Sequence, residues 1–308
     1  MINRTLIRIK ILQIIYAYYQ NGAGDLKAAE KDLLFSLRKS YDLYHYFLLL
    51  IIALTNLQER ILDGRMHKYM PTDEELHPNM RLVNNRFARQ LELNEGLQHY
   101  VNEYKISWDN DRDFLRGMLD TLLASDLYAA YLDDPDDSYD TDREFWRTAF
   151  RTFVCGNESF NEYLEDKSIF WNDDVDIVGT FTLKTIKLFS EREGSRQTLI
   201  PMFNNEETRE FALTLFRESL LHGAEIRERI GRHMQNWETE RVANLDLIIM
   251  QLAVAELMAF PSIPVSVSLN EYIDMAKYYS TPKSGTFING ILSAIVDELK
   301  KEKVLFKD

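Results

Sequence analysis

Three basic side chains stand near the start of this 308-residue chain with no acidic residue among them. Arg4, Arg8 and Lys10 are the Lys and Arg residues of the first 24 positions, which hold no Asp or Glu. At about 100° per residue, Arg8 lies about 40° from Arg4 on a helix, so the two share a stripe and Lys10 projects elsewhere. Such a stripe can present guanidinium groups to phosphates. The spacing alone favours the alternative, in which Arg4 and Arg8 pair with carboxylates of neighbouring helices.

Other side chains with chemical potential stand in patterns that fit structural roles better. The six histidines show no metal-ligand spacing on one helix face, and Asp133 to Asp140 lacks the central Gly and closing Glu of a calcium loop. The single cysteine, Cys155, has no His signature nearby, which favours a small buried residue over a nucleophile. Trp171 to Asp174 could form a functional loop, although helix capping explains it as well. We therefore expect no catalytic residue, no metal site, no cofactor and no enzymatic activity.

The elements that would position these residues are helices. Apolar residues at helical spacing predict helices over 4–20, 25–62 and 206–233, one opened by Asn236-Trp237-Glu238, and two more over 266–279 and 284–300. Residues 65 to about 90 are expected to be a linker, 91–190 further helices separated by acidic loops, and 191–205 a second break. No convincing alternating strand appears. The predicted fold class is all-α.

Acidic residues are concentrated in the middle of the chain. The net charge is −13, yet residues 91–180 alone hold 22 Asp and Glu against 7 Lys and Arg, which is −15 and leaves +2 for the remainder. A strongly negative chain argues against nucleic acid as a ligand, whereas this distribution leaves both ends free to bind it.

The sequence also indicates a cytoplasmic protein without membrane contact. The longest apolar run, Phe47 to Leu54, has eight residues, far short of the roughly 20 needed to span a bilayer, and is expected to be a buried helix segment. One cysteine excludes an internal disulfide, and no signal peptide is visible.

Four segments near the C-terminus closely resemble the NusB transcription antitermination family, in matching order and with matching gaps. They are the helix Arg241 to Leu257, the turn Ile263 to Val267, the stretch Leu269 to Lys277 and the stretch Ser284 to Leu292. The start, Arg8 to Tyr16, looks like the family's first helix. The resemblance covers roughly 1–60 and 206–308, and this long, acidic-centred form is similar to versions from Bacteroidetes-type bacteria.

This resemblance implies a NusB-like bundle of two small helical subdomains. We expect N-terminal helices over 1–64, an acidic helical insertion of unknown role over 65–205, and a C-terminal NusB-like region over 206–308. Family members bind boxA RNA together with the ribosomal protein NusE and help RNA polymerase to read through terminators on ribosomal RNA operons. The partners implied are therefore boxA-like single-stranded RNA, NusE and, indirectly, the RNA polymerase elongation complex.

Family members contact RNA through their basic N-terminal stretch and the turn before their last helix. Carried over by position, the contacts implied are Arg4, Arg8, Lys10, Lys283, Ser284 and Phe287. Arg and Lys neutralise phosphates, and an exposed Phe can stack on an unpaired base. Spacing alone favours a core position for Phe287, one turn before Ile291. The resemblance includes Glu271 and Asn289, which we assign to capping and packing.

Three other functions remain open on the sequence. The acidic insertion could dock a basic protein partner without any direct RNA binding. NusB-like domains also occur in ribosomal RNA cytosine methyltransferases, although no doubly wound α/β domain follows here. An enzyme with a site around Trp171 to Asp174 is the third.

Overall fold

The computed structural model describes residues 1–234 and 244–305, and it is helical throughout, with no strand in these two ranges. The predicted all-α class is confirmed. The helix start expected at Asn236-Trp237-Glu238 lies outside the described residues. No helix in the described part of the chain is long and apolar enough to cross a membrane.

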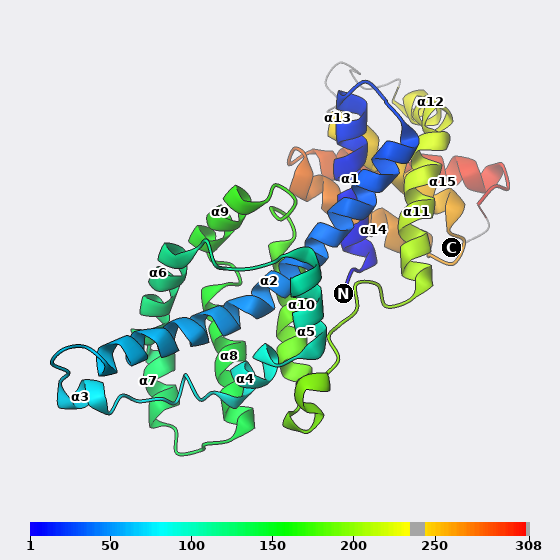
Figure 1. Cartoon of the computed structure of the whole chain (residues 1–308). Helices are drawn as coiled ribbons and strands as arrows, with labels where there is room; N and C mark the ends of the chain where they lie inside the picture. The colour runs from blue at the N-terminus through cyan, green and yellow to red at the C-terminus, as the bar shows by residue number, and fades with distance from the viewer. Residues whose placement is uncertain (235–243, 306–308) are drawn as a thin grey trace. The chain divides into compact units, whose positions relative to one another are not determined.

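The chain divides into two compact units. One comprises Met1 and residues 38–202, and the other comprises 2–37 and 203–308. We call them the insertion unit and the terminal unit. The sequence predicts that residues 38–64 group with the N-terminal helices, but their contacts place them with 65–202. The boundary falls inside α2 (Leu26–Met66), one continuous helix that supplies residues to both units (Figure 1).

The terminal unit is built around one helix that is apolar on every side. This helix is α13 (Asn244–Ala259), and it packs against every other helix of the unit except α2. Every residue from Ile248 to Leu257 is buried, as expected for a helix surrounded by others. The unit contains α1 (Arg4–Gln20), the start of α2, α11 (Glu206–Leu221), α12 (Gly223–His233), α13 (Asn244–Ala259), α14 (Val265–Tyr279) and α15 (Ser284–Lys301).

In the insertion unit, α8 packs against α4, α6, α7 and α10. The second half of α2 contributes Tyr44, whose hydroxyl lies 2.7 Å from Thr185 Oγ1, and Phe47, whose ring lies 5.4 Å from that of Phe150. Both side chains are fully buried, which agrees with the buried segment expected at Phe47 to Leu54. The unit contains α3 (Asp73–Leu76), α4 (Arg86–Glu92), α5 (Glu95–Tyr104), α6 (Arg112–Leu123), α7 (Asp126–Asp133), α8 (Tyr139–Phe153), α9 (Glu158–Lys167), α10 (Val175–Leu188) and the 3-10 turn η1 (Glu191–Arg196).

Candidate nucleic-acid interface

Helix α1 presents one of its two arginines at the surface. Asn3 caps the helix by accepting the N–H of Leu6, 2.8 Å away, so the chain starts its first turn at Arg4. The Arg4 side chain is 41% exposed, donates to Glu207 Oε1 over 2.9 Å, and lies over the ring of Phe211. An exposed ion pair of this kind contributes little free energy, so its guanidinium is available to another anion.

The second arginine is inside the protein. Arg8 is 3% exposed and forms a two-pronged contact with Glu256 of α13, with Nε–Oε2 and Nη2–Oε1 distances of 2.7 and 2.8 Å. Its Nη1 donates to Glu271 of α14 over 3.1 Å. Ser268 and Tyr272 donate to the remaining lone pairs of Glu256, at 2.8 and 2.9 Å.

The contacts around Arg8 and Glu256 keep both side chains charged although they are buried. Burial disfavours the charged guanidinium, but the hydrogen bonds that Arg8 donates to Glu256 and the nearby carboxylates outweigh burial and raise the pKa of Arg8. Burial and the charge of Glu256 raise the pKa of the Tyr272 hydroxyl well above its ordinary value, so that group stays a hydrogen-bond donor. The cluster joins α1, α13 and α14 through hydrogen bonds between charged groups, which are the strong ones.

Two further candidates are also buried. Lys10 is 0% exposed, and Ser284 is 2% exposed. The Ser284 hydroxyl donates to Asp246 Oδ2 over 2.8 Å and accepts the backbone N–H of Thr281, so it fixes the turn between α14 and α15 onto α13. Both side chains serve the interior of the terminal unit.

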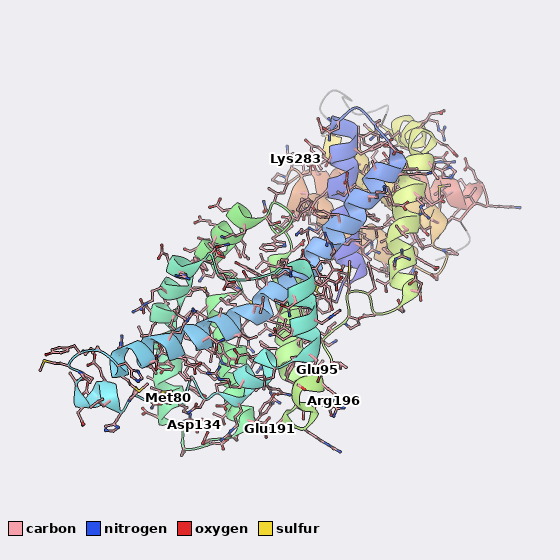
Figure 2. The ribbon with its side chains drawn as sticks, viewed as in Figure 1. Met80, Glu95, Asp134, Glu191, Arg196 and Lys283 are labelled. Atoms are coloured by element: carbon pink, nitrogen blue, oxygen red, sulfur yellow. The ribbon has the colours of Figure 1, made fainter. Side chains whose placement is uncertain are left out.

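The remaining two candidates lie at the beginning of α15. Lys283 is exposed and lies at the outer edge of its unit in Figure 2. Phe287, one turn later, is half-buried, between the core position favoured by its spacing and the exposed position implied by the resemblance. Lys283 is also next to Ser284, so the turn that Ser284 anchors determines where its ammonium group projects.

The structure thus divides the six expected RNA contacts into two groups. Arg4, Lys283 and Phe287 have solvent-accessible side chains, whereas burial removes Arg8, Lys10 and Ser284 from contact with any ligand in this conformation. The alternative that Arg4 and Arg8 pair with carboxylates of neighbouring helices describes both correctly. Arg4 contacts α11 through Glu207 and Phe211, and the turn at Lys283 is anchored to α13 through Asp246.

Sequence reasoning missed the partners of Arg8. Glu256 is the one charged residue in the run Leu247 to Leu257, and a carboxylate in an apolar helix needs a partner charge. That signal pointed to a buried ion pair. Glu271, assigned to capping and packing, instead accepts from Arg8 and Thr5.

The other residues considered as metal-binding or catalytic candidates make structural contacts in the described part of the chain. No group of three or more His, Cys, Asp or Glu among them could hold a metal ion. Burial raises the pKa of Cys155 to about 11, which keeps it a thiol. The Trp171 indole donates to the Lys39 carbonyl over 2.8 Å, and Asp174 stands at the N-terminus of α10, where it accepts from Ser40 over 2.6 Å.

Comparison with known proteins places the similarity near the C-terminus. A model of the family described as "NusB family" matches residues 180–297, which include all of α11 to α14. The "Transcription antitermination protein NusB" of Salinibacter ruber is 43% identical over 108 residues, covering 35% of this chain and 68% of that protein. The proteins of the same name from Chloroherpeton thalassium and Bacillus subtilis are each 38% identical, over 33% and 28% of this chain and 48% and 70% of their own lengths. No solved structure matches the chain.

Proposed function

This chain belongs to the NusB family, and we propose that it acts in transcription antitermination by binding boxA-like single-stranded RNA together with the ribosomal protein NusE. Its site of action would be the RNA polymerase elongation complex on ribosomal RNA operons. The observation that carries this proposal is the identity of 43% to a NusB protein, together with a family match that runs through the terminal unit.

The charge of the terminal unit supports it as the RNA-binding part. Residues 2–37 and 203–308 hold 17 Lys and Arg against 19 Asp and Glu, whereas residues 38–202 hold 19 against 30. RNA binding depends on clustered cations, and the nearly neutral unit repels phosphates least. Arg4 and Lys283 are the cations we assign to the RNA backbone, and Phe287 is the ring we assign to a base. Arg8, Lys10 and Ser284 then act indirectly, by holding α1 and the α14–α15 turn in position.

The proposal predicts that NusE increases RNA affinity. A gel shift with boxA-like RNA should show tighter retention when NusE is present than when it is absent. Lys283→Glu should weaken retention about tenfold, since it replaces an attractive charge by a repulsive one at the RNA backbone. The matched control is Lys300→Glu near the other end of α15, which is also exposed and should change affinity less than about twofold.

Two results would count against this function. One is the absence of RNA retention at low salt with and without NusE. The other is an equal effect of the two lysine variants, which would mean that net charge, and no local contact, controls binding.

A further inference from the structure

A groove of about 400 Å³ lies between α7 and α8 of the insertion unit. Its floor is apolar and includes Leu127, Ala130 and the stacked rings of Tyr131 and Phe145, whose centroids are 4.1 Å apart. Both rings are buried and fixed by their packing. The floor can therefore receive a large apolar side chain without rearranging.

The rim of this groove is acidic. Asp134, Asp140 and Glu144 line it, and its lining, all within the described residues, contains no Lys or Arg. Residues 126–148, which run from the start of α7 into α8, hold eight Asp and Glu against two Arg. Those two arginines pair with the rim from their own helix, Arg143 with Asp140 at 3.0 Å and Arg147 with Glu144 at 2.7 Å. Each rim carboxylate keeps lone pairs for a further donor, since a carboxylate offers about four acceptor sites.

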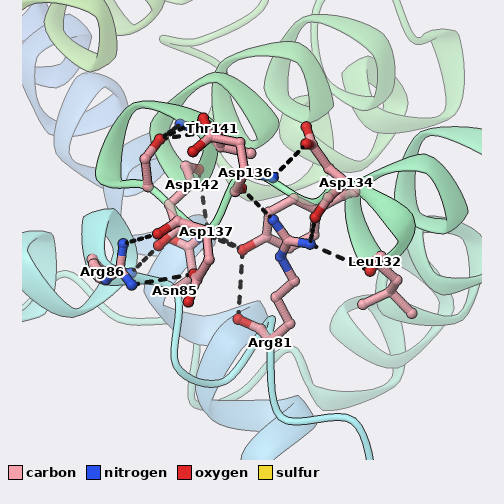
Figure 3. A network of polar contacts seen from close by, with 11 residues as sticks. Arg81, Asn85, Arg86, Leu132, Asp134, Asp136, Asp137, Thr141 and Asp142 are labelled. Atoms are coloured by element: carbon pink, nitrogen blue, oxygen red, sulfur yellow. Dashed lines mark hydrogen bonds and ion pairs between the residues drawn. The ribbon is translucent and has the colours of Figure 1, made fainter.

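The loop that carries Asp134 is held in one conformation (Figure 3). Arg81 inserts its guanidinium against the backbone of the loop and donates to three carbonyls, those of Leu132, Asp134 and Asp136, at 3.3, 2.5 and 2.7 Å. Arg86 donates to the carbonyl of Asp137 over 2.8 Å. The Asp134 carboxylate is exposed, and one of its oxygens accepts the backbone N–H of Asp136 over 2.9 Å, which fixes its position. A rim fixed beforehand loses little entropy when a ligand binds.

We propose that the α7–α8 groove binds a basic segment of a partner protein, in which Lys or Arg residues flank a large apolar side chain. The apolar side chain occupies the floor, and the cations contact Asp134, Asp140 and Glu144. Charge complementarity between this rim and a cationic segment steers the encounter and excludes nucleic acid, because the same carboxylates repel phosphates. This surface belongs to the insertion unit, so it adds a second interaction to the one proposed for the terminal unit.

The test uses the full chain and two fluorescein-labelled peptides of about twelve residues. Both carry the same Lys and Arg residues, and they differ in having Leu or Ser at the central positions. By fluorescence anisotropy, the Leu peptide should bind about tenfold more tightly than the Ser peptide, and added salt should weaken both. Ala130→Arg, which fills the groove and adds a positive charge, should weaken the Leu peptide about tenfold.

The chain offers a matched control for this variant. Ala129 is the neighbouring exposed alanine on α7 and does not line the groove, so Ala129→Arg should change peptide affinity less than about twofold. RNA retention should be unchanged in both variants, which separates this proposal from the function assigned to the terminal unit.

Four outcomes would overturn the docking site. The peptides could fail to bind, or the Leu and Ser peptides could bind equally, which would indicate attraction by charge alone. The two alanine variants could also weaken binding equally. Displacement of the Leu peptide by millimolar spermidine as effectively as by unlabelled Leu peptide would assign the groove to small polycations instead.

Discussion

Arg8 and Glu256 are charged inside the terminal unit because each neutralises the other. Removing one partner of a buried pair leaves the other charge without compensation, which costs about 3–5 kcal/mol. Glu256→Gln should therefore lower the free energy of unfolding by several kcal/mol in urea denaturation. Glu207→Gln removes the partner of the exposed Arg4 in the same way and should cost less than about 1 kcal/mol. Equal losses of unfolding free energy for the two variants would show that the buried ion pair contributes no more stability than the exposed one.

The same cluster changes how substitutions of Arg8 must be interpreted. If Arg8 contacted RNA, as the family resemblance implies, Arg8→Glu would weaken RNA binding and leave the fold intact. In the structure this change would place a third carboxylate beside Glu256 and Glu271, so we expect loss of stability and, through it, loss of every activity of the terminal unit. Lys283 is the better probe of RNA contact because its side chain is exposed.

His45 makes the insertion unit sensitive to acid. Burial lowers the pKa of His45 to about 4, although the Tyr41 carbonyl and the charge of Asp42 act in the opposite direction. The ring stacks on Tyr100 at 3.7 Å, and its Nδ1 donates to the Tyr41 carbonyl over 2.8 Å. Because the unfolded chain binds this proton at a higher pH than the folded chain does, stability falls as pH drops from 6.5 towards 4.

The magnitude of this loss follows from the size of the shift. A difference of two to three pKa units corresponds to about 3 kcal/mol, complete near pH 4. Urea denaturation at several pH values should show a smaller loss across this window for His45→Gln than for the unaltered protein. If the two pH profiles run parallel, His45 is not the group responsible.

At the residue scale, the sequence predicted the shared stripe of Arg4 and Arg8 but not what each one touches. A stripe follows from helical periodicity, which is local. Glu256 is 248 positions away from Arg8 along the chain, and no local pattern specifies which distant helix packs on α1.

Among the elements, the loop between α7 and α8 receives three hydrogen bonds from one side chain. Arg81 is half-buried and lies over the Tyr131 ring at 4.6 Å, in addition to its three carbonyl contacts. Arg81→Met keeps the aliphatic stem but removes all three donors, and should cost about 1–3 kcal/mol. Hydrogen exchange should then accelerate in residues 133–138, since their backbone loses its support.

The control for Arg81 is Arg116. Its guanidinium pairs with Asp120 four residues along the same exposed helical face. Arg116→Met should therefore change neither stability nor loop exchange measurably. Equal exchange in the two variants would mean that the loop is ordered by its own turns.

Most helices were predictable because their periodicity and end signals are local. The segment expected to be a linker shows the limit, since it contains α3 and the start of α4. Its signals were present: Thr72 and Glu75 form a capping box, and Asn85 caps α4 by accepting the N–H of Ala88. The two prolines and several asparagines of the segment favour a loop, and they outweighed these capping signals in the sequence analysis. The helix expected over 206–233 is divided into α11 and α12 next to Gly223, where a Cβ would lie 2.9 Å from Gln251 Nε2.

For the whole molecule, the sequence predicted the separation of charge but not the boundary between the units. The acidic middle corresponds to the insertion unit, at 30 acids against 19 bases, and this follows from counting alone. The first boundary lies within a continuous helix, between residues 37 and 38, where no Gly, Pro or change of period marks it. Only the contacts of the buried residues reveal it.

The continuity of α2 means that the insertion cannot be excised at its loop ends. A chain lacking 65–205 would keep the half of α2 that carries Tyr44 and Phe47, but it would lose Thr185 and Phe150, which cover them. The shortened protein would expose the apolar face of this helix to solvent and would tend to aggregate. A version of the terminal unit that folds by itself would therefore need new residues along the second half of α2, in addition to the removal of 65–205.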